Sequence, residues 1–221
     1  MYIYIYNNKN IMKLVNISTL LSVTFNYVIQ TCKYLNIDES HGLKHSMDVL
    51  HFANKIYNNE QKKNLYLEEQ KDIIYVSAII HDMCDRKYID EKVGLVNINN
   101  YMENYMDYDK LEVVNNIISK MSYSKTIKNG FPNLEKYQLA YHIVREADLL
   151  SGYDIERCII YSMMVENLPY NEAVQRAMFI FEQRVLKYRE DNLFVTDYSK
   201  NKSLELHKKA LIDIENLSGF L

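Results

Sequence analysis

The sequence contains few of the residues that interrupt helices. Of its 221 residues only 5 are glycine and 2 are proline. Several of these stand where a helix is expected to end or begin, at Gly130, Pro132, Gly152 and Pro169. The scarcity of helix breakers, together with the scarcity of alternating polar and apolar segments, argues against a sheet-rich protein. We therefore predict an all-α fold.

Long apolar stretches are also missing. No segment approaches the roughly 20 uncharged apolar residues that a membrane-spanning helix needs, so we expect no membrane association. The opening Met1–Tyr6 lacks the basic start and the small-residue cleavage site of a signal peptide. We interpret residues 1–11 as an N-terminal tether and Met12 as an alternative start.

Neither the cysteines nor the charge suggests an extracellular or nucleic-acid-binding protein. The three cysteines, Cys32, Cys84 and Cys158, are dispersed and form no CxxC motif, which is typical of a reducing compartment. The expected location is therefore the cytoplasm. A formal net charge of -3 provides no general attraction for a polyanion, and we expect no stable complex with nucleic acid.

The length and the 48% hydrophobic content are sufficient for one well-buried core, so residues 12–221 are predicted to form a single domain. Asp38 or Ser40 is expected to cap the second helix, with Gly42 in its first turn. Residues 122–135 are predicted to be irregular. Apolar spacing predicts helices at about 15–35, 41–58, 66–83, 92–106, 109–121, 135–150, 153–167, 170–190 and 200–217.

Four side chains suggest a metal site, namely His45, His81, Asp82 and Asp148. His81-Asp82 directly follows the apolar run Ile73–Ile80, where an unpaired buried carboxylate would be costly. His45 lies on the apolar face of a predicted helix, near its start. Two imidazoles and two carboxylates suit one divalent ion, with Mn or Mg expected first and Co, Ni, Fe or Zn also suitable.

The order of these residues resembles the H…HD…D signature of the HD-domain metal-dependent phosphohydrolases. Residues 38–45 (DESHGLKH), 81–88 (HDMCDRKY) and 117–125 (IISKMSYSK) are similar to segments of the branch that contains small nucleotide pyrophosphohydrolases. The resemblance covers about residues 36–155. It implies a compact helical HD domain, to which residues 156–221 would add further helices.

The resemblance also implies an activity: a metal-activated water would attack a phosphoryl group of a nucleotide or related phosphate ester. Lys87 and Lys125 would offset the developing negative charge. Asp85 is the candidate general acid or water-orienting base, although it could equally pair with a neighbouring cation. His41 would bind phosphate, supply a proton or support a neighbouring group.

Further residues near these motifs remain weaker candidates. Glu146 is a less favoured acid or base, because its neighbour Arg145 suits an ordinary ion pair. Cys84 is interpreted as a bystander thiol. A positive lining for phosphate is expected from Lys44, Arg86, Lys87, Lys125, Lys128 and Arg145.

The sequence leaves several alternatives open. Cleavage between the α and β phosphates of a nucleoside triphosphate is the leading expectation, and a 5′-nucleotidase or other phosphomonoesterase is the nearest alternative. A non-catalytic sensor that binds a nucleotide is the main alternative outside enzymes. A two-iron oxygenase is disfavoured, since only His142 lies between the HD pair and Asp148. A homo-oligomer remains open.

Overall fold

The computed structural model describes residues 16–219, so the predicted tether and the alternative start at Met12 lie outside the described part of the chain. All regular structure in that part is helical, which confirms the predicted all-α fold. The ten α-helices are α1 (Ile17–Leu35), α2 (Leu43–Glu60), α3 (Lys71–Ile80), α4 (Glu91–Met102), α5 (Tyr108–Ile118), α6 (Tyr123–Asn129), α7 (Gln138–Ser151), α8 (Ile155–Met164), α9 (Tyr170–Gln183) and α10 (Asp197–Ser218). Short 3-10 helices precede α3 and α7 and follow α9.

Helix α3 occupies the centre of the hydrophobic core. Its residues from Ile73 to Ile80 are all buried, and it packs against α1, α2, α5 and α7. An apolar run without a polar face can only be accommodated by neighbours on every side. The next residues, His81 and Asp82, therefore emerge from the middle of the molecule.

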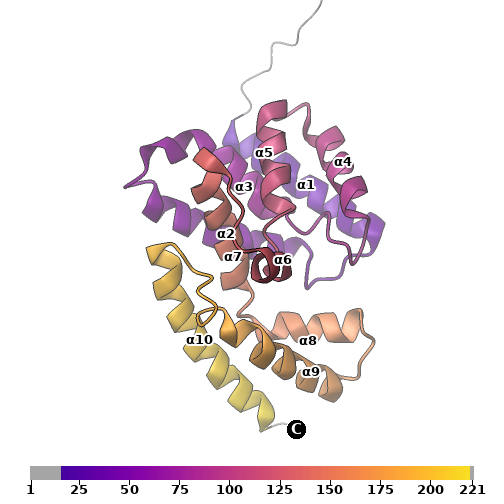
Figure 1. Ribbon diagram of the computed structural model, residues 1–221. Helices are drawn as coiled ribbons and strands as arrows, with labels where there is room; N and C mark the ends of the chain where they lie inside the picture. The colour runs from indigo at the N-terminus through magenta and orange to yellow at the C-terminus, as the bar shows by residue number, and fades with distance from the viewer. Residues whose placement is uncertain (1–15, 220–221) are drawn as a thin grey trace, which may run out of the picture.

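The C-terminal third forms a second group of helices beside this body (Figure 1). Helices α8 and α9 pack against each other as a hairpin, and α10 packs mainly against α7. The apolar face of α9, which includes Ala173, Val174, Ala177 and Phe181, is buried. These side chains join one buried cluster that extends from Leu20 to Ala210.

A buried ion pair fixes the segment before α10 to α7. Arg145 is 1% exposed and donates to the Leu193 carbonyl at 2.6 Å. Glu146 is fully buried and accepts from the Val195 amide at 2.7 Å and from the Thr196 hydroxyl at 2.7 Å. Bonds through Arg145 Nη2 and both Glu146 oxygens hold this segment in place, while Arg145 Nε and Nη1 are buried without a partner among the described residues.

Two local expectations were wrong. Residues 122–135 are not wholly irregular, because the Ser122 side chain caps the short helix α6 by accepting from the Lys125 amide. Helix α2 is capped by neither Asp38 nor Ser40. Its N-cap is Gly42, without a side-chain bond, because the Asp38 carboxylate instead accepts from the Ser40 amide within the preceding turn.

The predicted boundaries differ most at the end of α9, which was expected at residue 190 but lies at Gln183, and around α3. The helix expected over 66–83 is divided into a 3-10 turn, Leu65–Gln70, and α3, which ends at Ile80. His81 and Asp82 consequently lie in a turn beyond the helix, where the Met83 amide donates to the Ile80 carbonyl. Between residues 16 and 219, no helix is both long and apolar enough to cross a bilayer.

Candidate metal centre

Two imidazoles from different helices face each other inside the protein. His45 lies in the first turn of α2 and is 2% exposed, and His81 follows α3 and is 7% exposed. Their Nε2 atoms are 3.2 Å apart. Two Nε2 atoms at this distance can share only one proton, so at least one lone pair is directed at the other ring.

The neighbours of the two rings direct the Nε2 atoms toward a common point. His81 Nδ1 lies 3.0 Å from the Ala78 carbonyl, which can only accept, so this nitrogen carries a proton and Nε2 faces His45. The Ser151 hydroxyl lies 3.4 Å from Nδ1 of His45. Partners on the Nδ1 side orient imidazoles for binding a metal through Nε2.

Two carboxylates complete the group. Asp82 Oδ2 lies 3.2 Å from His45 Nε2 and 3.3 Å from His81 Nε2, and Asp148 Oδ1 lies 3.5 and 3.6 Å from the same two atoms. Asp82 Oδ2 is buried and makes no hydrogen bond of acceptable geometry within the described residues. A buried carboxylate oxygen without a hydrogen bond fits a metal ligand.

The charges of this group depend on one another. Burial alone would raise the pKa of both carboxyl groups, but the nearby imidazoles outweigh it and hold the pKa of Asp82 and Asp148 well below the usual value. Burial likewise disfavours a charged His81, yet Asp82 and Asp148 raise the pKa of His81 to about 10. Two ionised carboxylates thus require a cation between the rings, either a proton or a metal.

The ligand atoms of His45, His81 and Asp148 all lie within 4.8 Å of one another, and this group could hold a metal ion. Asp82 brings a fourth ligand atom to the same two imidazoles. The two nitrogen and two oxygen donors fit the mixed ligand set of a divalent transition metal or Mg.

A cleft of about 560 Å³ opens onto this group. The wall contains His81, Asp82 and Asp148, and it also contains six cationic side chains and two further carboxylates. The cationic residues are Arg86, Lys87, Lys125, Lys128, Arg157 and Arg184, and the carboxylates are Asp85 and Glu91. We refer to this cavity as the metal cleft.

Three of the candidate catalytic residues lie together at one edge of the metal cleft. Lys87 Nζ donates to His41 Nε2 at 3.0 Å and lies 3.5 Å from Asp85 Oδ2. Burial lowers the pKa of His41 to about 3, and the charges of Lys87 and Arg157 act in the same direction. His41 is therefore a neutral acceptor that orients the Lys87 ammonium.

The fourth candidate, Lys125, lines the cleft but is already bonded. Its ammonium donates to Glu91 Oε1 and to the Ser119 carbonyl, both at 2.7 Å. Glu91 also accepts from Arg86 Nε at 2.7 Å. The structure thus brings Lys125 to the cleft and gives it a protein carboxylate as its partner.

Two predicted lining cations do not reach the cleft. Lys44 is paired with Asp48 on the surface of α2, and Arg145 is buried against the Leu193 carbonyl. Glu146 lies with Arg145 and does not line the cleft either. Cys84 does line it, and burial raises the pKa of this thiol to about 12; the candidate metal-binding group does not include it.

Two further residues that were not predicted, Arg157 and Arg184, line the cleft. Arg157 lies on α8, where its Nη1 is 2.6 Å from His45 Nδ1, 3.1 Å from His45 Nε2 and 3.3 Å from the Ser151 hydroxyl. Arg184 directly follows α9 and lies over the Tyr123 ring, with 4.6 Å between the guanidinium carbon and the ring centroid. No motif marks either residue, because their approach to the cleft depends on how α8 and α9 fold back.

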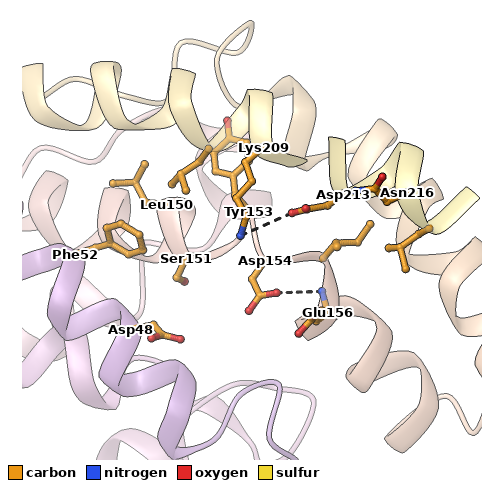
Figure 2. A pocket seen from close by; sticks show the side chains of 13 residues that line it. Asp48, Phe52, Leu150, Ser151, Tyr153, Asp154, Glu156, Lys209, Asp213 and Asn216 are labelled. Carbon is orange, nitrogen blue, oxygen red and sulfur yellow. Dashed lines mark hydrogen bonds and ion pairs between the residues drawn. The ribbon is translucent and has the colours of Figure 1, made fainter. Parts of the chain in front are cut away.

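A second cavity of about 470 Å³ lies between α2, the start of α8 and α10 (Figure 2). Ser151, which also contacts His45, forms part of its wall. The charged residues around it are four carboxylates and one lysine: Asp48, Asp154, Glu156, Asp213 and Lys209. We refer to it as the acidic cavity.

The fold and the site define an all-helical protein with a candidate mononuclear metal centre in a cation-lined cleft. No protein-family model matches the chain. No curated protein matches it either, so the function has to be inferred from the residues themselves.

Proposed function

We propose that the protein is an HD-type metal-dependent phosphohydrolase that acts on nucleotides. The observation that carries this proposal is the convergence of His45, His81, Asp82 and Asp148, the last three of which line a cleft that is otherwise rich in cations. The four residues occur in the order of the H…HD…D signature. The cationic lining fits a phosphate ester better than a neutral substrate.

The four residues would hold one divalent ion, which would lower the pKa of a bound water and polarise a phosphoryl oxygen. Their side chains come from three separate parts of the fold, the start of α2, the turn after α3 and α7. Because these segments pack on one another, the ligand positions are fixed by the core rather than by a mobile loop.

Lys87 is the residue that we propose to bind the phosphoryl group. Its ammonium lies at the edge of the cleft, and His41 accepts only one of its three hydrogens. The remaining donors can stabilise negative charge that develops on phosphoryl oxygens. His41 would act as a positioning residue, through its bond to Lys87.

Asp85 is the proposed proton-transfer residue. Its carboxylate lines the cleft, and Oδ1 accepts from the Lys87 amide at 2.9 Å. This bond and the 3.5 Å separation from the Lys87 ammonium fix the carboxylate beside the proposed metal ligands without adding it to them. Lys125, which also lines the cleft, would contribute positive charge that it shares with Glu91.

The test is hydrolysis of nucleoside mono-, di- and triphosphates by the metal-stripped protein after addition of Mn, Mg, Co or Ni. Phosphate and pyrophosphate are quantified separately. We expect pyrophosphate release from a triphosphate, and a loss of at least about 100-fold in Asp82→Ala. Asp213→Ala removes a carboxylate from the acidic cavity and should retain full activity.

The products distinguish the alternatives. Phosphate released from monophosphates would identify a nucleotidase. Phosphate released from di- or triphosphates would still indicate a hydrolase, but one that cleaves a different phosphate bond. Nucleotide binding without turnover under any metal would contradict the enzyme and favour a sensor. Equal rates in the wild type and Asp82→Ala would contradict the proposed site.

A further inference from the structure

The hairpin of α8 and α9 brings two arginines to the metal cleft. Arg157 projects from the first turn of α8, and Arg184 directly follows the last residue of α9. Both line the cleft, although they are 27 positions apart in the sequence. The hairpin therefore supplies part of the site outside the segment that resembles HD phosphohydrolases.

Ion pairs with carboxylates of the cleft hold three of its six cations, and Lys128, Arg157 and Arg184 have no such pair among the described residues. Arg86 and Lys125 pair with Glu91, and Lys87 pairs with Asp85. Among residues 16–219, neither Arg157 nor Arg184 has a carboxylate oxygen within 4.0 Å. The two hairpin arginines thus keep their charge available for an anionic ligand.

The surroundings of the two arginines suit phosphate recognition. The guanidinium of Arg157 reaches the edge of the metal-binding group, 2.6 Å from the His45 ring. The guanidinium of Arg184 lies on the Tyr123 ring. A guanidinium over an aromatic ring can still present N–H donors to phosphate oxygens, two at a time.

Charge balance favours a ligand with several phosphates. The cleft wall carries six cationic side chains against the four carboxylates Asp82, Asp85, Glu91 and Asp148, which leaves two positive charges in excess. A divalent ion would double this excess. A monophosphate carries about two negative charges at neutral pH, whereas a triphosphate chain carries about four, which matches the total.

We infer that Arg157 and Arg184 form a clamp for the polyphosphate chain of the substrate, beyond the phosphate that lies at the metal-binding group. With this clamp, the cleft selects ligands that carry two or more linked phosphates. The identification of the bound polyphosphate as part of a nucleotide rests on the proposed function. The binding of a polyphosphate chain by the two arginines can be measured without turnover.

The test is calorimetric titration of the full-length, metal-stripped protein with inorganic tripolyphosphate, pyrophosphate and phosphate in the presence of a chelator. For the wild type, affinity should rise with chain length. Arg157→Ala and Arg184→Ala should each weaken tripolyphosphate binding by about tenfold, the loss expected for a charged hydrogen bond. Arg157→Lys and Arg184→Lys keep the charge but lose the planar fork, so each should lie between the wild type and the alanine variant.

Arg176→Ala is the matched control. Arg176 lies on α9 of the same hairpin, is paired with Glu166 and does not line the cleft. Its removal changes the net charge by the same amount and should leave tripolyphosphate affinity unchanged. Circular dichroism and melting curves establish that the compared variants are folded, and the lysine variants replace any alanine variant that is not.

Four results are decisive. A tenfold loss confined to the Arg157 and Arg184 variants supports the clamp. Wild-type affinity in these variants, or equal affinity for phosphate and tripolyphosphate, overturns it. If the protein hydrolyses nucleotides but the arginine variants bind normally, the clamp fails and the proposed function stands. If nothing is hydrolysed but tripolyphosphate binding needs both arginines, the clamp stands and the proposed function fails.

Discussion

The metal cleft and the acidic cavity lie close together and carry opposite charge. Ser151 links them, since it lines the acidic cavity and contacts His45 at the metal-binding group. Glu156 and Arg157 are neighbours on α8, yet Glu156 lines the acidic cavity and Arg157 the metal cleft. Consecutive helical residues point about 100° apart, so one helix can supply each cavity with its own charge.

This contrast shows what distinguishes a functional carboxylate from an ordinary one. In the metal cleft, Asp82 and Asp148 are mostly buried and converge on two imidazoles. In the acidic cavity, Asp154 accepts from the Glu156 amide as the N-cap of α8, and Asp213 lies 3.9 Å from Lys209 (Figure 2). The number of acids is similar, but only the first set has its oxygens directed at one point.

The largest expected effect on stability concerns a carboxylate that lines neither cavity. Glu146→Ala leaves Arg145 buried without its partner and removes the acceptor for residues 195 and 196. We expect the free energy of unfolding to fall by about 3–5 kcal/mol, as measured by urea denaturation.

Glu156→Ala is the matched control, because it removes an exposed carboxylate from the acidic cavity and should cost less than about 0.5 kcal/mol. If the two variants lost similar free energies of unfolding, burial would not explain the difference between these two carboxylates.

A second expected effect is a loss of stability in acid, which limits the pH range over which the two cavities can be compared. Burial lowers the pKa of His142 to about 4 from its ordinary value of 6.5, and the charge of Arg145 adds to this. The unfolded chain therefore binds the proton more readily than the folded chain between these values. The stabilisation is complete above about pH 6.5 and is lost as the pH falls toward 4.

We expect His142 to account for about 1–3 kcal/mol of this loss. The measurement is the free energy of unfolding at several pH values for the wild type and for His142→Gln, which removes the titrating ring. The difference between the two proteins should change between pH 6.5 and 4 and stay constant from pH 7 to 8. A constant difference over the whole range would refute this assignment.

The smallest expected effect lies in the acidic cavity itself. Asp213→Asn and Glu156→Gln should each change tripolyphosphate affinity by less than about twofold, because neither residue lines the metal cleft and exposed charges are screened by salt. Calorimetry under the conditions used for the arginine variants provides the measurement. A tenfold gain in affinity would mean that the two cavities act as one electrostatic site.

The sequence predicted the helical fold because its apolar positions recur at helical spacing and its breakers are few. It also predicted the group of His45, His81 and Asp148, because each residue stands at the end or on the buried face of an apolar segment. Glu146 was a candidate because it is close to Asp148 in the sequence, but it does not lie at the site. Two residues before Asp148 on a helix, it lies about 200° around the axis and faces away from the cleft.

The remaining features depend on tertiary structure. The path of the hairpin decides that Arg157 and Arg184 reach the cleft, and no local pattern records that path. Similarly, Lys125 lines the metal cleft, but its bond to Glu91 depends on how α4 packs. Helix α6 was missed because its cap, Ser122, also suits a loop.

The central claim is that four side chains form one metal centre. Its most direct test is equilibrium dialysis of the metal-stripped protein against Mn²⁺, with the wild type, Asp148→Asn and Asp213→Asn compared at equal concentration. We expect one tightly bound ion per chain in the wild type and Asp213→Asn, and a loss of at least about tenfold in affinity in Asp148→Asn. Equal binding by all three proteins would contradict the account.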